Sequence, residues 1–366
     1  MSGDAVRDQA TGSQPGGEAA ADLTAPAGVT PGGGAVPQPA VTAGSAAGGA
    51  RTWGRWGGVE MRNLGLVAVL VVLVVIGTLT SDTFLTVANI KNILVSSSVS
   101  GVVTVGVTLV IIGGGIDLSV GALVALASVW ATTLQTQSYG PVVMIITALT
   151  VGLVAGLVNG VLIAYGDLVP FIVTLAMLVS ARGLAARIAE NRTQIVQSQA
   201  IKNIATDEIF GIPLLVVLLA VVVAIGWLLL NRTTFGRRTL AIGGNAEAAR
   251  LAGIDVRRTT VMLYVISGIC CGIAAVMIIS RTTTGSSTHG ELYELDAIAA
   301  AIIGGTLLAG GRGTIIGSLL GVIVFTTITN IFILNNLATE TQNIAKGLII
   351  IAAVLLQRRA TRTRTT

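Results

Sequence analysis

The hydrophobic residues of the chain are gathered into long, nearly uninterrupted runs that short polar stretches separate. Runs such as LGLVAVLVVLVVIGTLT and IPLLVVLLAVVVAIGWLLL approach the roughly 20 apolar residues that a helix needs to cross about 30 Å of hydrocarbon. The pattern predicts an all-α polytopic membrane protein with about ten transmembrane helices, some of them broken or half helices. The expected crossings are residues 64–80, 93–112, 120–135, 142–165, 168–188, 213–230, 260–280, 297–309, 314–335 and 342–356.

Composition and charge support the membrane assignment and predict an orientation. Of the 366 residues, 53% are hydrophobic and only 11% are charged, which is far from the composition of a soluble domain. The net charge of +5 comes mainly from short loops, where basic residues mark the cytoplasmic side. Arg51, Arg55 and Arg62 precede the first run, and Arg358 and Arg359 follow the last, so both termini are expected in the cytoplasm. No nucleic-acid partner is expected.

The chain divides into three parts by composition. Residues 1–58 are rich in Gly, Ala and Pro without apolar periodicity, and they are predicted to be a disordered cytoplasmic tail. Residues 59–357 contain all of the apolar runs and form the predicted transmembrane domain, in which residues 231–259 are a long cytoplasmic loop. Residues 358–366 form a basic cytoplasmic tail.

An acidic residue interrupts the apolar pattern in the stretch GGGIDLSVG, residues 113–121. A charge at mid-bilayer costs at least about 2.5 kcal/mol on insertion scales, so Asp117 is expected to face the protein interior and to accept hydrogen bonds. A half-helix with Asp117 as its N-cap would satisfy the carboxylate. Two interpretations stay open, a cap on a broken helix and a break that lines a conduit. The candidate path residues are Gly115, Asp117, Ser119, Gly121 and Asn159.

The sequence around Asp117 has a weak echo later in the chain. GGIDLSVGAL from Gly114 and GGRGTIIGSL from Gly310 share their glycine spacing, and each joins two apolar runs. Many transporters are built from half-molecule repeats with interrupted helices near the substrate path. A chance likeness of two glycine-rich turns is the alternative.

The cytoplasmic loop contains a compact helix signal, GGNAEAARLAG, residues 243–253. Asn245 is placed to cap, Glu247 lies in the first turn where the positive dipole end favours it, and Gly253 is placed to end the helix. Two interpretations stay open, a helix that lies on the anionic leaflet and a docking helix that inserts into a partner's groove. The candidate docking residues are Gly243, Gly244, Asn245, Glu247, Arg250, Leu251 and Gly253.

Further acidic residues lie on the predicted outer side, in the stretch HGELYELDAIAA. His289 and Glu291 are expected to be solvated in a loop, whereas Glu294 and Asp296 adjoin the next apolar run. The latter two are candidates for the outer mouth of a path or for docking an external partner. The other polar residues of the crossings are mostly hydroxyls and amides, which suits a neutral polar solute better than an ion.

The sequence lacks the motifs of several catalytic and metal sites. It contains no GxxxxGK[ST] phosphate-binding loop, no HExxH and no CxxC. His289 is the only histidine, and the adjacent Cys270 and Cys271 are expected to pack as small apolar side chains. We therefore expect no catalytic residue, no metal and no cofactor bound by this chain. If ATP drives the protein, another polypeptide must hydrolyse it.

Four stretches together resemble the permease subunits of bacterial ABC importers for monosaccharides, the ribose, xylose and galactose permease family. They are LVIIGGGIDLSVGALVAL, PFIVTLAMLVSARGLA, TTFGRRTLAIGGNAEAARLAGIDV and YELDAIAAAIIGGTLLAGGRGTIIGSLLGVIV. The resemblance extends in order from about Leu64 to Leu356 and is carried most specifically by GIDLSVG, GGN..AARL.GI and ELDAIAA. The tail before Gly58 lies outside it.

The resemblance implies partners and roles. In that family two permease copies, or two related permeases, form the pathway in the cytoplasmic membrane. Two ATPase subunits, which use ATP and Mg, bind beneath, and an extracytoplasmic binding protein delivers a pentose or hexose. Residues 243–254 resemble the coupling loop that docks in the ATPase, which favours docking over binding to lipid. Residues 115–121 resemble part of the broken region near the path, so Asp117 would support a gate structurally.

Two other classes of function are alternatives to an ATP-driven importer. A proton-coupled secondary sugar transporter would use Asp117 as the proton carrier, and its uptake would collapse with the proton gradient. A membrane scaffold would recruit a partner through its cytoplasmic loop and would show no solute flux.

Overall fold

The computed structural model describes the backbone of residues 54–362 and the surroundings of side chains 64–351. The helices are α1 (Gly54–Thr80), α2 (Val87–Ile112), α3 (Val120–Ala131), α4 (Leu134–Ser138), α5 (Pro141–Ala164), α6 (Pro170–Ile188), α7 (Gln199–Thr206), α8 (Leu214–Arg232), α9 (Thr234–Gly244), α10 (Ala246–Leu251), α11 (Val256–Thr282), α12 (Tyr293–Ile303), α13 (Ile315–Leu334) and α14 (Thr339–Arg362). The strands within this range are β1 (Gln194–Ile195), β2 (Glu208–Ile209), β3 (Ile212–Pro213) and β4 (Thr284–Gly285), which form the antiparallel pairs β1–β4 and β2–β3.

Six of the described helices, α2, α5, α6, α8, α11 and α13, are long and apolar enough to cross a membrane. They coincide with six of the expected crossings. α1 contributes a shorter apolar stretch, Leu64–Thr80, and α14 covers the last expected crossing. Residues 1–53 and 363–366 lie outside the described residues, so the disorder expected of residues 1–53 stays a prediction. Residues 54–58, which were expected to belong to the same disordered tail, form the start of α1 instead.

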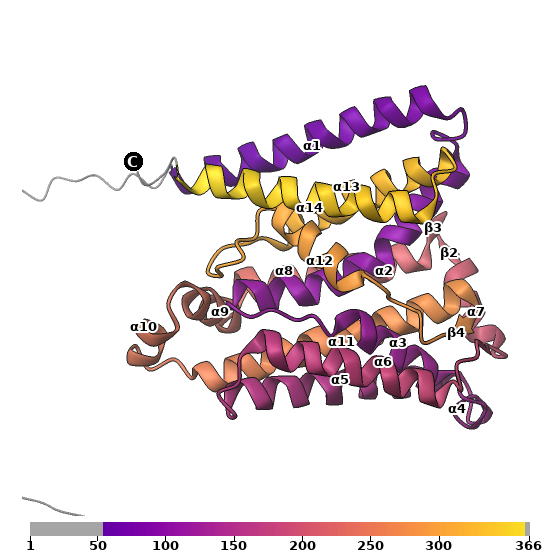
Figure 1. Cartoon of the computed structure of the whole chain (residues 1–366), viewed down its shortest axis with the longest axis horizontal. Helices are drawn as coiled ribbons and strands as arrows, with labels where there is room; N and C mark the ends of the chain where they lie inside the picture. Colours follow the sequence, from indigo (N-terminus) through magenta and orange to yellow (C-terminus); the bar gives the residue numbers. More distant parts are fainter. Residues whose placement is uncertain (1–53, 363–366) are drawn as a thin grey trace, which may run out of the picture. The chain divides into compact units, whose positions relative to one another are not determined.

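The third expected crossing is a half helix that follows a break. Residues 113–119 are not helical, and Figure 1 shows them as a thin segment that leads from the end of α2 to the start of α3. α3 has only 12 residues. The expected crossing at 120–135 is therefore too long, because Thr133 leaves the helical conformation and its hydroxyl caps the separate helix α4.

A second half helix, α12, also follows a non-helical segment. Residues 283–292 connect α11 to α12, which has 11 residues. The crossing expected at 297–309 ends early, at Ile303, because Gly305 adopts a φ of +82° that favours glycine over other residues. The described residues thus contain two half helices, α3 and α12, each preceded by a non-helical segment, in line with the expectation that some helices are broken or half helices.

Different short helices and loops lie at the two ends of the helix bundle. Figure 1 shows α9 and α10 at one end and α4, α7 and the β2–β3 hairpin at the other. We call these the α10 end and the α7 end. α2 finishes at the α10 end, because Gly311 near α13 and Gly243 of α9 both contact Ile112 there.

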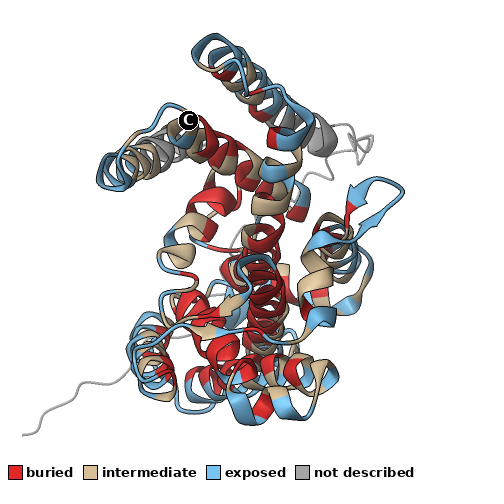
Figure 2. Cartoon of the chain, turned by 90° about the vertical axis from the view of Figure 1, so that its right-hand side faces the viewer, coloured by how far each residue is buried: buried red, intermediate tan, exposed pale blue. Residues whose placement is uncertain are grey.

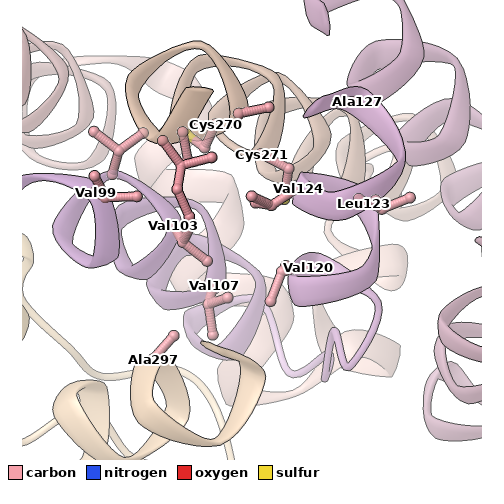
Figure 3. Packing of buried hydrophobic residues seen from close by; sticks show 14 of the residues in the cluster. Val99, Val103, Val107, Val120, Leu123, Val124, Ala127, Cys270, Cys271 and Ala297 are labelled. Carbon is pink, nitrogen blue, oxygen red and sulfur yellow. The ribbon is translucent and has the colours of Figure 1, made fainter. Parts of the chain in front are cut away.

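α2 lies in the interior of the helix bundle, whereas α5 and α8 lie at its periphery. In the most apolar stretch of α2, 83% of residues are buried, against 28% for α5 and α8. Figure 2 shows the buried residues concentrated in the central helices. Side chains of α2 pack there against α3 and α11, and the two cysteines are free and buried among them, as expected (Figure 3). The labelled side chains include Val99, Val103, Val107, Val120, Val124, Cys270 and Cys271.

Glycines allow α5 and α11 to approach closely. A Cβ on Gly156 would lie 3.2 Å from the Cα of Gly268, and a Cβ on Gly272 would lie 2.7 Å from the carbonyl oxygen of Ala148. Small residues at such spacing are typical of packing between membrane helices, where close backbone contact replaces the hydrophobic driving force. This contact brings one face of α11 against the break that precedes α3.

A pair of buried amides joins α2 to α13. The Asn89 Nδ2 donates to Asn330 Oδ1 at 3.0 Å, and the Asn330 Nδ2 donates to Asn89 Oδ1 at 2.8 Å. The Asn89 Nδ2 also donates to the carbonyl of Phe84 at 2.9 Å. Because each amide satisfies the other, neither has to face lipid unpaired.

Candidate functional site

Asp117 is held in the break by three hydrogen bonds from neutral donors. Its side chain is buried, with the residue only 1% exposed. The N–H and the hydroxyl of Ser119 donate to Oδ1 at 3.0 and 2.6 Å, and the hydroxyl of Ser267 on α11 donates to Oδ2 at 2.8 Å. The Nδ2 of Asn159 on α5 donates to the Ser119 hydroxyl at 3.0 Å. Asp117 thus connects the break to α11 directly and to α5 through the hydroxyl of Ser119.

The N-cap position differs from the sequence prediction. Ser119, not Asp117, is the residue that precedes α3, and Ser119 makes no side-chain cap bond. Asp117 reaches the helix start from two residues upstream, by accepting the N–H of Ser119. The expectation that Asp117 accepts hydrogen bonds at the start of a half helix is confirmed, whereas its assignment as the N-cap residue is wrong.

The backbone of the break is fastened from two further helices. The hydroxyl of Tyr264 on α11 donates to the carbonyl of Ile116 at 3.1 Å, and the hydroxyl of Thr174 on α6 donates to the same oxygen at 3.4 Å. Gly115 is needed beside them, because a Cβ there would lie 2.7 Å from the Tyr264 hydroxyl. Neither Tyr264 nor Ser267 was predicted at the site from the sequence. A single hydroxyl in an apolar helix is common, and the neighbouring residues do not indicate which distant group it bonds.

The two half helices begin next to each other. The place that a Cβ on Gly121 would take is filled by the carbonyl of Gly290 and a carboxylate oxygen of Glu294. Gly121 belongs to the first turn of α3, and Glu294 belongs to the first turn of α12. The Glu294 Oε2 is buried and has no hydrogen-bond partner within the described residues. Gly121 and Glu294, predicted as parts of separate sites, therefore lie together.

The segment before α12 lies along α3. The Nδ1 of His289 lies 3.2 Å from the Ser128 hydroxyl, and a Cβ on Gly285 would lie 2.9 Å from the Ser128 carbonyl oxygen. The guanidinium of Arg182 on α6 holds this segment by donating to the carbonyls of Ser287 and His289 at 2.6 and 2.8 Å. The expectation that His289 is solvated is wrong, because its side chain packs against α3. Glu291 is exposed, as expected.

The two residues predicted for an outer mouth have different surroundings. The Asp296 carboxylate pairs with the ammonium of Lys346 on α14 at 3.1 Å, and both side chains are mostly buried. Glu294 instead faces Gly121 and is attracted by Arg182. Since successive helix residues are rotated by about 100°, positions two apart point to nearly opposite sides of α12.

The compact helix predicted in the loop is present as α10. The Oδ1 of Asn245 accepts the N–H of Ala248 at 2.9 Å, and Gly253 has a φ of +79°. Glu247 and Arg250 form an exposed ion pair at 2.6 Å. The hydrogen bond from Arg250 lowers the pKa of Glu247, and the same bond raises the pKa of Arg250. The predicted cap and stop are both confirmed.

The remaining loop residues differ in exposure. Leu251 at the end of α10 is 78% exposed, so the helix presents a large apolar side chain at the α10 end. Gly244 has open space where a Cβ would stand. Gly243 does not, because the carbonyl oxygen of Ile112 and the N–H of Gly311 occupy that place. Gly243 therefore contacts the membrane helices, whereas the rest of the predicted docking group faces outward.

The break and α10 together make up the candidate functional site. The Asp117 carboxylate is buried and accepts three hydrogen bonds. This geometry suits a structural role, in which the side chain holds the break in one conformation. Asp117, Ser119 and Asn159 are brought together as predicted, Gly115 and Gly121 adjoin them, and α10 forms a separate exposed element. Chemically, this arrangement offers hydroxyl and amide groups that hold the break by hydrogen bonds.

Comparison with known proteins gives a family match and several relatives. The family described as "Branched-chain amino acid transport system / permease component" matches residues 89–354. The chain is 40% identical to the ribose import permease protein RbsC of Bacillus subtilis over 301 residues, which cover 82% of this chain and 94% of that protein. It is 36% identical to RbsC of Escherichia coli, with coverage of 81% and 93%. It is 35% identical to the L-arabinose transport system permease protein AraH of Escherichia coli, with coverage of 80% and 90%. No solved structure matches.

Proposed function

The chain belongs to the family of transport-system permease components, as a multi-pass protein of the bacterial cytoplasmic membrane, and we propose that it is the permease subunit of an ATP-driven importer for a monosaccharide. The observation that carries this proposal is the match to ribose and arabinose permeases over at least 90% of their lengths. The family description names branched-chain amino acids, but the relatives that match along nearly their whole length are named for pentoses.

The α10 end is proposed to be the cytoplasmic side. Arginines surround α10 in the chain, and basic residues in short loops are retained in the cytoplasm. This orientation puts α4, α7 and the β2–β3 hairpin outside, where an extracytoplasmic sugar-binding protein would deliver its ligand. The basic residues of the loop are Arg232, Arg237, Arg238, Arg250, Arg257 and Arg258.

α10 is proposed to dock in a cytoplasmic ATPase subunit that hydrolyses ATP with Mg. The helix has six residues, which give it too small an apolar face to bind a lipid surface by itself. Glu247 and Arg250 neutralise each other, so α10 does not present the basic face that anionic lipid attracts. Exposed Leu251 is the kind of anchor that fills a pocket in a partner.

Asp117 is proposed to support the gate during alternating access and not to carry a proton. Three neutral donors satisfy the carboxylate, and its hydrogen-bond partners come from elements that pack together in the core. The pathway itself is proposed to need a second permease, either a copy of this chain or a related one. In each subunit, the break would then move together with the buried helices around it.

The test is purification of the tagged full-length protein from its own cells in mild detergent, followed by reconstitution of whatever complex is recovered. Mass spectrometry is expected to find an ABC ATPase subunit, and vesicles are expected to take up labelled ribose or arabinose when ATP and the matching binding protein are supplied. An ATPase subunit with its catalytic site inactivated is the control. Uptake by the permease alone, driven by a pH gradient, would instead establish the proton-coupled transporter.

A further inference from the structure

The end of α9 touches two loops that come from distant parts of the chain. The N–H of Gly311 donates to the carbonyl of Ile112 at 2.9 Å. A Cβ on Gly243 would lie 2.5 Å from the nitrogen of Gly311, and the carbonyl oxygen of Ile112 would be closer still. A Cβ on Gly310 would lie 2.8 Å from the carbonyl oxygen of Gly243 and 2.9 Å from the Cα of Gly114. We call Ile112, Gly114, Gly243, Gly310 and Gly311 the glycine junction.

The glycine junction adjoins each element of the candidate site. Downstream of Gly243 the chain enters α10, and downstream of Gly114 it enters the break that contains Asp117. Gly310 and Gly311 lie in the loop between the half helix α12 and α13. The end of α9, which leads into α10, therefore meets the Asp117 break and the loop that follows α12 at a single place through backbone contacts.

Contacts at the junction are between backbone atoms, which makes them stiff. A flexible side chain between two elements can change rotamer and absorb a displacement, whereas touching backbones must move together or separate. Glycine is required here because any Cβ on Gly243 would occupy the place of its neighbours. Positive φ values of +85°, +84° and +73° at Gly114, Gly310 and Gly311 further restrict these positions to glycine.

We propose that Gly243 is a positioning residue for transport, through which movement of α10 reaches the Asp117 break and the α12–α13 loop. The inference rests on the proposed function, since it takes the movement to be imposed by an ATPase subunit bound at α10. It adds the physical connection, which is the contact of Gly243 with Ile112 and Gly311.

The neighbouring glycine offers a matched control. Gly243 and Gly244 are the last two residues of α9, and both precede the capped start of α10. A Cβ on Gly244 meets nothing within 4 Å, whereas a Cβ on Gly243 overlaps the junction. The substitutions Gly243→Ala and Gly244→Ala therefore make the same change in helix propensity, but only the first one displaces the contact.

The variants are tested in the complete complex in lipid vesicles, with ATP hydrolysis and sugar uptake measured together. Gly243→Ala is expected to retain the ATPase subunit and its hydrolysis but to lose about tenfold in sugar imported per ATP, a typical size for coupling between sites. Gly244→Ala leaves the junction contact in place and is expected to keep the wild-type amount of sugar imported per ATP, because any effect of this docking-loop residue on capture of the ATPase subunit would lower hydrolysis and uptake together. Equal uptake per ATP in the two variants would overturn the proposal, because a merely structural glycine would lower the yield of complex without changing this ratio.

A measurement on the unaltered complex covers the case in which Gly243→Ala does not fold. Hydrogen–deuterium exchange is compared with and without a non-hydrolysable ATP analogue, in peptides that cover residues 110–117, 245–253 and 307–313. All three are expected to change protection together. A change confined to 245–253 would overturn the inference while leaving the proposed function intact. Purification of the wild type without any ATPase subunit would instead overturn the proposed function, and the inference with it.

Discussion

Replacement of Asp117 distinguishes a hydrogen-bond acceptor from a proton carrier. In Asp117→Asn the amide oxygen can keep both bonds from Ser119, whose N–H and hydroxyl lie 3.0 and 2.6 Å from Oδ1. The new amide nitrogen takes the place of Oδ2, 2.8 Å from the Ser267 hydroxyl, which can turn to accept its hydrogen. All three contacts are therefore expected to survive the substitution.

The expected cost follows from the kind of hydrogen bond that is lost. Bonds to a charged group contribute about 1.5–3 kcal/mol and neutral bonds about 0.5–1.5 kcal/mol, so removing the charge costs about 1 kcal/mol per bond. Bonds between membrane helices average only about 0.6 kcal/mol, which makes the total cost about 1–3 kcal/mol. Asp117→Leu instead leaves three donors unpaired at about 1–3 kcal/mol each, which gives about 3 kcal/mol or more.

The assay combines the melting temperature in detergent with ATP-driven uptake by the reconstituted complex. Asp117→Asn is expected to melt slightly below the wild type and to keep most of the uptake, whereas Asp117→Leu is expected to give little folded protein. An Asp117→Asn protein with normal melting and assembly but no uptake would refute this reasoning. It would show that the carboxylate must change its protonation during transport.

Three further predictions concern the contacts around the half helices and α10. Gly121→Val is expected to abolish monodisperse protein in size-exclusion chromatography, because its side chain would displace the start of α12, whereas Gly183→Ala in open space is expected to be tolerated. The pKa of Glu247 is lowered in the folded protein, so its ion pair is present at neutral pH and is lost as the pH falls through that lowered pKa. Capture of the ATPase subunit should therefore be constant across neutral pH and weaken only in acid, and Glu247→Gln, already weakened at neutral pH, should show no such acid step. Lys346→Met leaves the Asp296 carboxylate unpaired and should lower the free energy of unfolding. The loss should be smaller than that for breaking a fully buried pair, which is about 3–5 kcal/mol, because the Lys346 and Asp296 side chains are 18% and 22% exposed. Its melting temperature should recover in the double variant with Asp296→Asn, and no recovery would contradict the pairing.

The membrane helices were largely predictable from the sequence, and their interruptions were predictable in kind. An apolar run reports on burial and length, and this information suffices to find α2 or α13. It does not fix the last residue of a half helix, because α3 ends at Ala131 whereas the apolar pattern predicts an end at 135. There, a hydroxyl that caps the next turn decides the boundary, and such local bonds compete with the helix without changing the hydropathy.

The candidate site was predictable only at residues whose type is unusual for their place in the sequence, or whose spacing marks a helix cap. Asp117 stands out because a charge in an apolar run must be explained, and the caps of α10 follow from sequence spacing. Ser267 and Tyr264 were missed because their partners are 150 and 148 residues away, and one hydroxyl is not unusual in an apolar helix. The contact between Gly121 and Glu294 depends on how the half helices pack, which no local pattern records.

The amide pair between α2 and α13 has a consequence for how the chain is made. Asn89 and Asn330 are 241 residues apart, and synthesis at about 5–20 residues per second separates their appearance by about 10–50 s. During this interval Asn89 lacks the amide that later pairs with it, and its Nδ2 has the nearby carbonyl of Phe84 as a partner. The buried contact between α2 and α13 can therefore form only when nearly the whole chain has been translated.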